Sequence, residues 1–90
     1  MATVGRFKVA NAFIQPGETI HQWWNNTPKE IVCIVDCMPF ANGTPAEIEI
    51  VRTWNVRQVG GTNAEREFHW EVKNRGKSSA LIDIYMAQIN

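Results

Sequence analysis

The sequence predicts an all-β fold, a single-domain antiparallel β-sandwich of about six strands that spans residues 1–90. Turn-forming residues divide the chain into six segments of strand length. Within most segments apolar and polar residues alternate, which is the period of a strand with one buried face. Ninety residues fit one domain and leave no room for a second. A small β-barrel is the alternative that the same pattern allows.

The first two segments are residues 4–14 and 18–25, with the turn sequence QPG between them. The second segment contains two adjacent tryptophans, Trp23 and Trp24. Because neighbouring side chains of a strand point to opposite faces, these two indoles cannot both lie in one core layer. We expect one of them to be buried and the other to face solvent or something outside its own sheet.

The third segment, residues 30–38, is apolar on both of its faces. One face carries Ile31, Cys33 and Val35, and the other carries Val32, Ile34 and Met38. A strand of this kind is covered on both sides. The second cover is expected to come from another part of this chain or from a second copy of it.

The two cysteines, Cys33 and Cys37, both belong to this third segment. In a strand they would lie about 13 Å apart, whereas a disulfide needs Cα atoms within about 7 Å. We therefore expect free, buried thiols. The N-terminus has no apolar run of signal-peptide length and no segment could span a membrane, so a cytoplasmic location is expected, with release by a non-signal route left open.

The fourth segment, residues 46–59, admits a helix as well as a strand. Thr44, Pro45 and Glu47 resemble a helix start, with a capping threonine and a first-turn proline. Against this, apolar residues occupy alternate positions and only Arg52 interrupts the alternation. The segment is also rich in β-branched residues, which lose rotamer freedom in a helix. The pattern favours a strand.

A short loop at residues 60–62 would pair the fourth segment with the fifth, residues 64–73, as an antiparallel hairpin. The resulting register places compatible side chains across the ladder. The expected pairs are Arg57 with Glu65, Glu49 with Lys73, Trp54 with Phe68, and Arg52 with Trp70.

The sixth segment, residues 79–89, is expected to pair with the fifth through a hairpin at residues 74–76, in which Gly76 takes the left-handed conformation. The apolar face of this hairpin is expected to carry Phe68, Trp70, Val72, Ala80, Ile82, Ile84 and Met86. The opposite face would carry Glu67, His69, Asp83 and Tyr85, with His69 across from Asp83. The stretch FHWEVKNRGKSSALIDIYMAQI reads like the last hairpin of an immunoglobulin-like sandwich, a pattern too common to indicate a function.

Charge and motif content exclude several functions. Nine basic and nine acidic side chains give a formal net charge of zero, which argues against nucleic acid as the main partner and leaves self-association easy. The chain has no nucleophile elbow and no phosphate-binding glycine loop. Asp36, within an apolar strand, has no second catalytic group that can be placed beside it. The candidate metal ligands lack the spacing typical of zinc sites; they are Cys33, Cys37, His21 and His69. We expect no enzyme activity, no metal and no cofactor.

Two functional hypotheses remain. The first is a lectin-like binding module, working as a homo-oligomer, that recognises a carbohydrate or a similar small polar ligand. Sugar rings stack on indoles, while amides and imidazoles bind hydroxyl groups. The expected ligand-binding residues are His21, Trp23, Trp24, Asn25, Asn26, Asn55, His69 and Tyr85. The second is a structural shell, tail or scaffold component whose exposed tryptophan and apolar segment 30–38 form subunit contacts.

Overall fold

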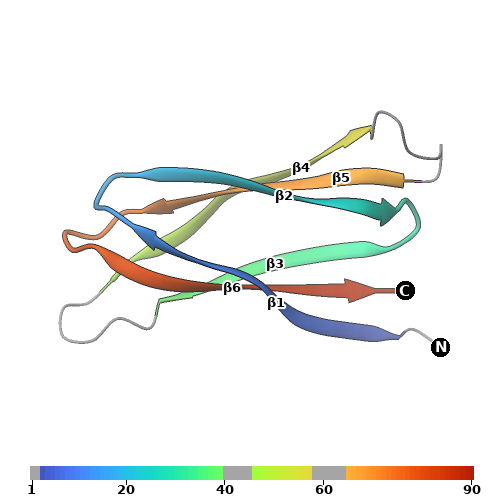
Figure 1. The fold of residues 1–90 in the computed structure, drawn as a ribbon, viewed down its shortest axis with the longest axis horizontal. Coiled ribbons are helices and arrows are strands. Elements are labelled where there is room, and N and C mark those ends of the chain that lie inside the picture. Colours follow the sequence, from blue (N-terminus) through green and yellow to red (C-terminus); the bar gives the residue numbers. More distant parts are fainter. Residues whose placement is uncertain (1–2, 40–45, 58–64) are drawn as a thin grey trace.

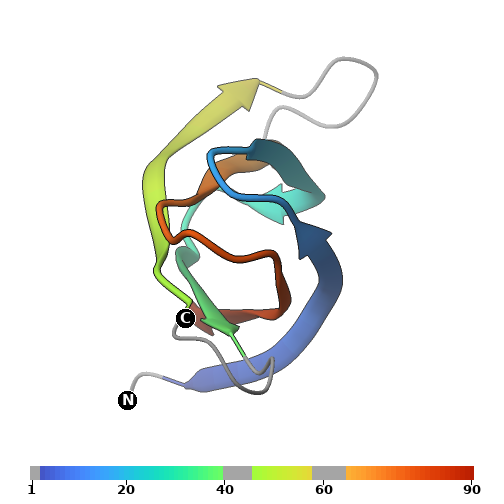
Figure 2. The same ribbon diagram turned by 90° about the vertical axis from the view of Figure 1, so that its left-hand side faces the viewer.

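The computed structural model describes residues 3–39, 46–57 and 65–90 of the chain, and these contain strands and no helix (Figure 1). Two three-stranded antiparallel sheets form, with strand orders β1-β6-β3 (sheet A) and β2-β5-β4 (sheet B). Figure 2 shows the strands surrounding a common interior. The strands are β1 (Val4–Ile14), β2 (Thr19–Pro28), β3 (Val32–Pro39), β4 (Ile48–Arg57), β5 (Glu65–Asn74) and β6 (Ala80–Ile89).

The two antiparallel sheets confirm the all-β prediction and are compatible with a β-sandwich. The alternative helix in the fourth segment is wrong, because Ile48–Arg57 is a strand. β4 and β5 are the one pair of consecutive strands that are hydrogen-bonded neighbours, and every other connection crosses between the sheets. This strand order does not confirm the immunoglobulin-like arrangement.

The core lies between the two sheets. Its buried apolar side chains are Ile14, Val35, Phe68, Trp70, Val72, Ala80, Ile82, Ile84 and Met86. Burying each of the larger ones contributes about 1.5–3 kcal/mol relative to leaving it exposed. The inward face expected for the fifth and sixth segments is therefore correct, residue for residue. The pairing behind that expectation is wrong, since β5 and β6 belong to different sheets and face each other across the core.

The connection from β5 to β6 is held by Asn74, which is fully buried. Its Nδ2 donates to the carbonyl oxygens of Ile14 (3.1 Å) and Ser78 (2.8 Å), and its Oδ1 accepts from the Gly76 amide (2.9 Å). Gly76 does not have the positive φ expected for a hairpin. Close packing favours glycine there for a different reason, because an added Cβ would lie 3.1 Å from the backbone nitrogen of Glu47 and one of the two would have to shift.

Three strands carry a β-bulge, one extra residue that changes which side chains share a face. The bulges lie at Val9 in β1, between Trp24 and Thr27 in β2, and at Val51 in β4. In the β2 bulge Asn26 has a positive φ of 56°, a conformation that asparagine tolerates better than most residues.

The bulge at Val51 alters the predicted register of β4 against β5. Before it, Glu49 pairs with Lys73 as expected. After it, every pair is displaced by one residue, so the remaining predicted pairs are wrong. The observed pairs are Arg52 with Glu71, Trp54 with His69, Asn55 with Phe68 and Arg57 with Arg66.

The outer face of sheet A is apolar and uncovered by the described residues. The second cover expected for β3 does not come from the described residues of the chain, since Ile34 and Met38 are more than half exposed, and a second copy is the alternative that is left. We name this surface the apolar face. Its large exposed hydrophobic side chains are Val4, Phe13, Val32, Ile34, Met38, Leu81 and Tyr85.

The ends of β1 and β6 meet at one end of sheet A. The Thr3 amide donates to the Asn90 carbonyl (3.1 Å), and the Asn90 amide donates to the Thr3 carbonyl (2.9 Å). No helix in the described ranges is long and apolar enough to cross a bilayer.

Candidate functional site

The outer face of sheet B carries a row of three rings, one from each strand. Trp23 of β2 and Trp54 of β4 each lie directly opposite His69 of β5 in the ladder. Both indoles stack on the imidazole, with ring centroids 5.7 Å and 5.1 Å away and interplanar angles of 23° and 22°. His69 is therefore held between two tryptophans and is only 7% exposed.

A hydrogen-bond chain links this row to a second histidine. His69 Nε2 lies 2.9 Å from Glu67 Oε1, and His69 Nδ1 lies 2.7 Å from His21 Nε2. An ionised carboxylate can only accept, so Nε2 of His69 carries a hydrogen. When both imidazoles are neutral, His69 Nδ1 then accepts from His21 Nε2–H, which leaves Nδ1 of His21 as an acceptor. The chain runs from a carboxylate through a buried ring to an exposed one.

Trp54 contacts side chains from its own strand and from the two other strands of sheet B. His21 stacks on it with ring centroids 4.9 Å apart, and the Arg52 guanidinium carbon lies 4.1 Å from the ring centroid on β4. Arg52 also pairs with Glu71, the residue opposite it on β5. These contacts fix the rings as one rigid layer, because each side chain is held by at least two neighbours.

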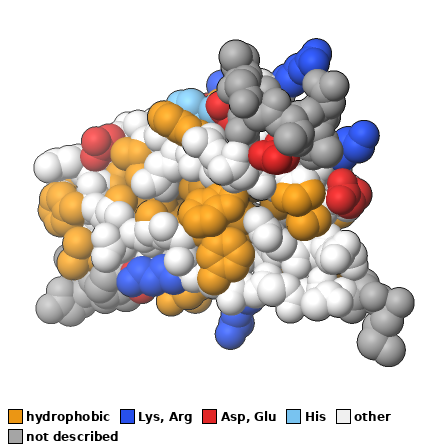
Figure 3. Space-filling view, turned by 45° about the vertical axis from the view of Figure 1, so that its right-hand side comes forward, with side chains coloured by type: hydrophobic (Ala, Val, Ile, Leu, Met, Phe, Trp, Pro, Cys, Tyr) orange, Lys and Arg blue, Asp and Glu red, His pale blue; other side chains and the backbone are white. Residues whose placement is uncertain are grey.

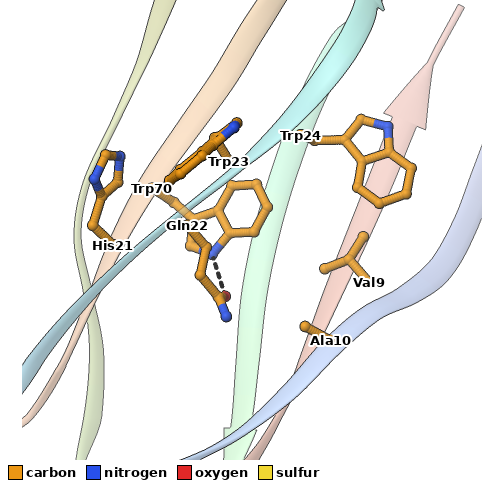
Figure 4. A pocket seen from close by; sticks show the side chains of 7 residues that line it. All are labelled: Val9, Ala10, His21, Gln22, Trp23, Trp24 and Trp70. Atoms are coloured by element: carbon orange, nitrogen blue, oxygen red, sulfur yellow. Dashed lines mark hydrogen bonds between the residues drawn. The ribbon is translucent and has the colours of Figure 1, made fainter.

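An opening between β1 and β2 lies next to this layer and has a volume of about 290 Å³. Its lining residues are Val9, Ala10, His21, Gln22, Trp23, Trp24 and Trp70. Figure 4 shows Trp24 beside Val9, and the Gln22 amide facing the indole nitrogen of Trp70. Trp70 Nε1–H donates to Gln22 Oε1 (3.2 Å), so the amide NH₂ of Gln22 is left to other partners.

The two adjacent tryptophans point to opposite sides of β2, as alternation requires. The expectation that one of them is a core residue is wrong, because Trp23 is 51% exposed and Trp24 is 37% exposed. Trp24 faces the open edge between the sheets, where its ring contacts Phe7 at a centroid distance of 5.4 Å. Figure 3 shows hydrophobic side chains exposed across the middle of the molecule, with a histidine near the upper edge of the view.

The structure brings together part of the predicted ligand-binding set. His21, Trp23 and Trp24 line the opening, and His69 lies directly behind Trp23. Asn25 and Asn26 are exposed and form the bulge that ends this stretch of β2. These six residues form one continuous region with Gln22 and Trp70.

The remaining two predicted residues lie elsewhere. Asn55 is on the other face of sheet B from His69, where its Oδ1 accepts a hydrogen bond from Arg66. Tyr85 is on the apolar face of sheet A, between Lys8 and Asp36. The structure therefore does not bring Asn55 and Tyr85 together with His69: the bulge in β4 turns Asn55 to the inner face of sheet B, and Tyr85 belongs to sheet A.

Sequence reasoning missed Trp54, which it placed in the core, and Glu67, which it gave no role. A signal for Trp54 was present, since the alternation of the fourth segment is interrupted at Arg52, next to the bulged Val51. An interruption in a period-two pattern indicates either a tolerated charge or a bulge. Periodicity alone does not distinguish them.

Within residues 3–39, 46–57 and 65–90, no three His, Cys, Asp or Glu side chains are arranged to hold a metal ion. Both cysteines are free thiols on the inner face of sheet A, so neither shares a sheet with the two histidines. Burial raises the pKa of the Cys37 thiol to about 12, and the nearby Asp36 carboxylate adds to this effect.

Comparison with known proteins gives no relative. No family model matches the chain, no curated protein matches it, and no solved structure matches its fold.

Proposed function

We propose that this protein is a non-enzymatic, lectin-like binding module whose ligand enters the opening between β1 and β2. The observation that carries the proposal is the pair of exposed indoles, Trp23 and Trp24, at an opening of about 290 Å³. An exposed tryptophan offers a large rigid apolar surface at little entropic cost, which is what binding sites use.

The chemistry of the lining favours a ligand with one apolar face and a polar rim. The indoles supply surfaces for the C–H face of a sugar ring. The Gln22 amide and the His21 imidazole supply a donor and an acceptor beside them. A carbohydrate has this combination of faces, so we assign the ligand to that class.

The experiment is a printed glycan array, followed by titration of the strongest-binding free oligosaccharide while tryptophan fluorescence is recorded. We expect saturable binding with a change in emission. Trp23→Ala and Trp24→Ala should each weaken binding by at least tenfold, equivalent to about 1.4 kcal/mol. The matched control is Phe13→Ala, which removes an exposed aromatic side chain from the other sheet and should bind normally. No binding on the array, or equal losses in all three variants, would contradict the proposal.

The second candidate, a structural or assembly component, is favoured by the apolar face of sheet A. The two candidates use different surfaces and are compatible with each other. A homo-oligomer held together by the apolar face would carry several identical ligand sites and would gain avidity from them. The cytoplasmic location and the immunoglobulin-like arrangement stay predictions from the sequence.

A further inference from the structure

The charged side chains on the apolar face of sheet A are arranged so that two copies of this face are complementary. Its charged side chains include Lys8 and Asp83, which form an ion pair at 2.9 Å within the chain. They also include Arg6 on β1 and Asp36 on β3. No ion pair to either of these two forms within the described parts of the chain. One unmatched cation and one unmatched anion thus lie on the two outer strands of the same face, with β6 between them.

A hollow of about 410 Å³ lies on the same face, over Ala87 and between Arg6 and Ile34. Arg6 and Ile34 flank Ala87 in the ladder, and the small side chain of Ala87 leaves the centre of the sheet low. Met38 and Tyr85 form part of the rim. A partner surface with projecting apolar side chains would fill this hollow and remove the exposed hydrophobic area from water.

We infer that the apolar face packs against the same face of a second copy of this chain, about a two-fold axis parallel to β6. Such an axis places β1 of each copy over β3 of the other, because β1 and β3 flank β6. Lys8, which pairs with Asp83 within the chain, then lies level with the partner subunit's Asp36. Arg6 lies on the same strand and extends toward the partner subunit's Asp36, and this contact occurs twice by symmetry. The two residues are offset by two positions along β6, or about 7 Å, which the long arginine side chain spans.

The charges select this axis over its alternative. A two-fold axis perpendicular to β6 would stack β1 on the partner subunit's β1 and β3 on its β3. The two basic residues of β1, Arg6 and Lys8, would then lie over the same basic strand of the partner, and Asp36 would lie over the strand that carries the partner subunit's Asp36. This axis brings like charges toward one another in a desolvated interface. The first axis instead brings opposite charges together, so Arg6 and Asp36 each gain an oppositely charged partner.

The inference does not rest on the ligand proposal, since no residue that lines the β1–β2 opening lies on the apolar face. Sedimentation equilibrium of the whole chain, from micromolar to millimolar concentration, measures the association. We expect a monomer–dimer equilibrium. Met38→Glu should abolish the dimer, whereas Val56→Glu, which places the same charge on an exposed position of sheet B, should leave it unchanged.

Charge reversal tests the axis. Arg6→Asp and Asp36→Arg should each raise the dimer dissociation constant at least about tenfold. The double variant should return it to near the unmodified value. Far-ultraviolet circular dichroism of each variant checks the fold. A chain that stays monomeric at millimolar concentration would overturn the inference without any variant, and a double variant as weak as either single one would overturn the axis.

Discussion

At the scale of single residues, the adjacent tryptophans show what alternation can and cannot establish. Their opposite directions follow from the period of a strand and were predictable from two letters of sequence. Burial was not predictable, because it depends on what lies beyond each face. Trp24 points toward the interior side of sheet B, but at the edge where β1 and β2 leave the sandwich open. The buried indole is Trp70, which is 1% exposed and lies on the central strand β5.

Alanine substitutions should therefore distinguish the core tryptophan, Trp70, from the exposed one, Trp23, by their effect on stability. Trp70→Ala should lower the free energy of unfolding by about 3–5 kcal/mol, since it leaves a cavity between the sheets and removes the partner of Gln22. Trp23→Ala should cost less than about 1.5 kcal/mol, because its side chain is half exposed. Urea unfolding followed by circular dichroism measures both. Similar losses for the two variants would contradict the assigned positions.

The Cys37 thiol gives a second prediction at this scale. Burial raises its pKa from 9.0 in an unfolded chain to about 12 in the fold, and burial also raises the pKa of Cys33. The thiolate is the reactive form, so iodoacetamide at pH 8.5 should label Cys37 far more slowly in the folded protein than in urea. Peptide mass spectrometry gives the two rates, and equal rates would refute the shift.

The raised pKa of Cys37 also determines how the stability of the fold changes with pH. Above pH 9 the unfolded chain loses the Cys37 proton while the folded chain keeps it, so the folded state binds more protons. The contribution of this thiol to stability is present below pH 9 and is lost as the pH rises toward 12. Cys37→Ala is the matched control, and its stability should decline less over that interval.

At the scale of strands, positions were predictable and partners were not. Alternating residues and turn signals located all six strands, because both are properties of neighbouring residues. The connection from Asn74 to Ala80 is short enough for a hairpin, but Asn74 bonds back to Ile14 and directs the chain into the other sheet. A buried asparagine that bonds a residue 60 positions away leaves no local trace in the sequence.

The bulge in β4 decides which ring meets His69, and it can be tested by deletion. Removing Val51 takes out the extra residue and preserves the pairs of Trp54 with His69 and Glu49 with Lys73. Removing Thr53 instead would turn over every side chain on one side of the deletion. We expect the chain without Val51 to unfold within a few degrees of the parent. The chain without Thr53 should unfold at a much lower temperature, as thermal melts by circular dichroism would show. A reversed order would contradict the register.

At the scale of the whole molecule, one fold presents two different surfaces. Sheet B presents aromatic rings fixed by stacking, which suits a small ligand, and sheet A presents aliphatic side chains with self-complementary charge, which suits a second copy. The sequence indicated both kinds of surface, but the structure places Asn55 and Tyr85 away from the opening that His21, Trp23 and Trp24 line. Which surface a residue joins depends on sheet membership, and four of the five connections between consecutive strands change sheet.

The backbone hydrogen bonds between Thr3 and Asn90 place the start of β1 directly beside the end of β6. The first and last strands are neighbours, so a peptide of a few residues could join the two ends and make the polypeptide circular. Such a ring could be reopened at a turn to give a permuted chain with new ends, and the same ladder would still form. Peptide tags attached before Thr3 and after Asn90 would begin side by side.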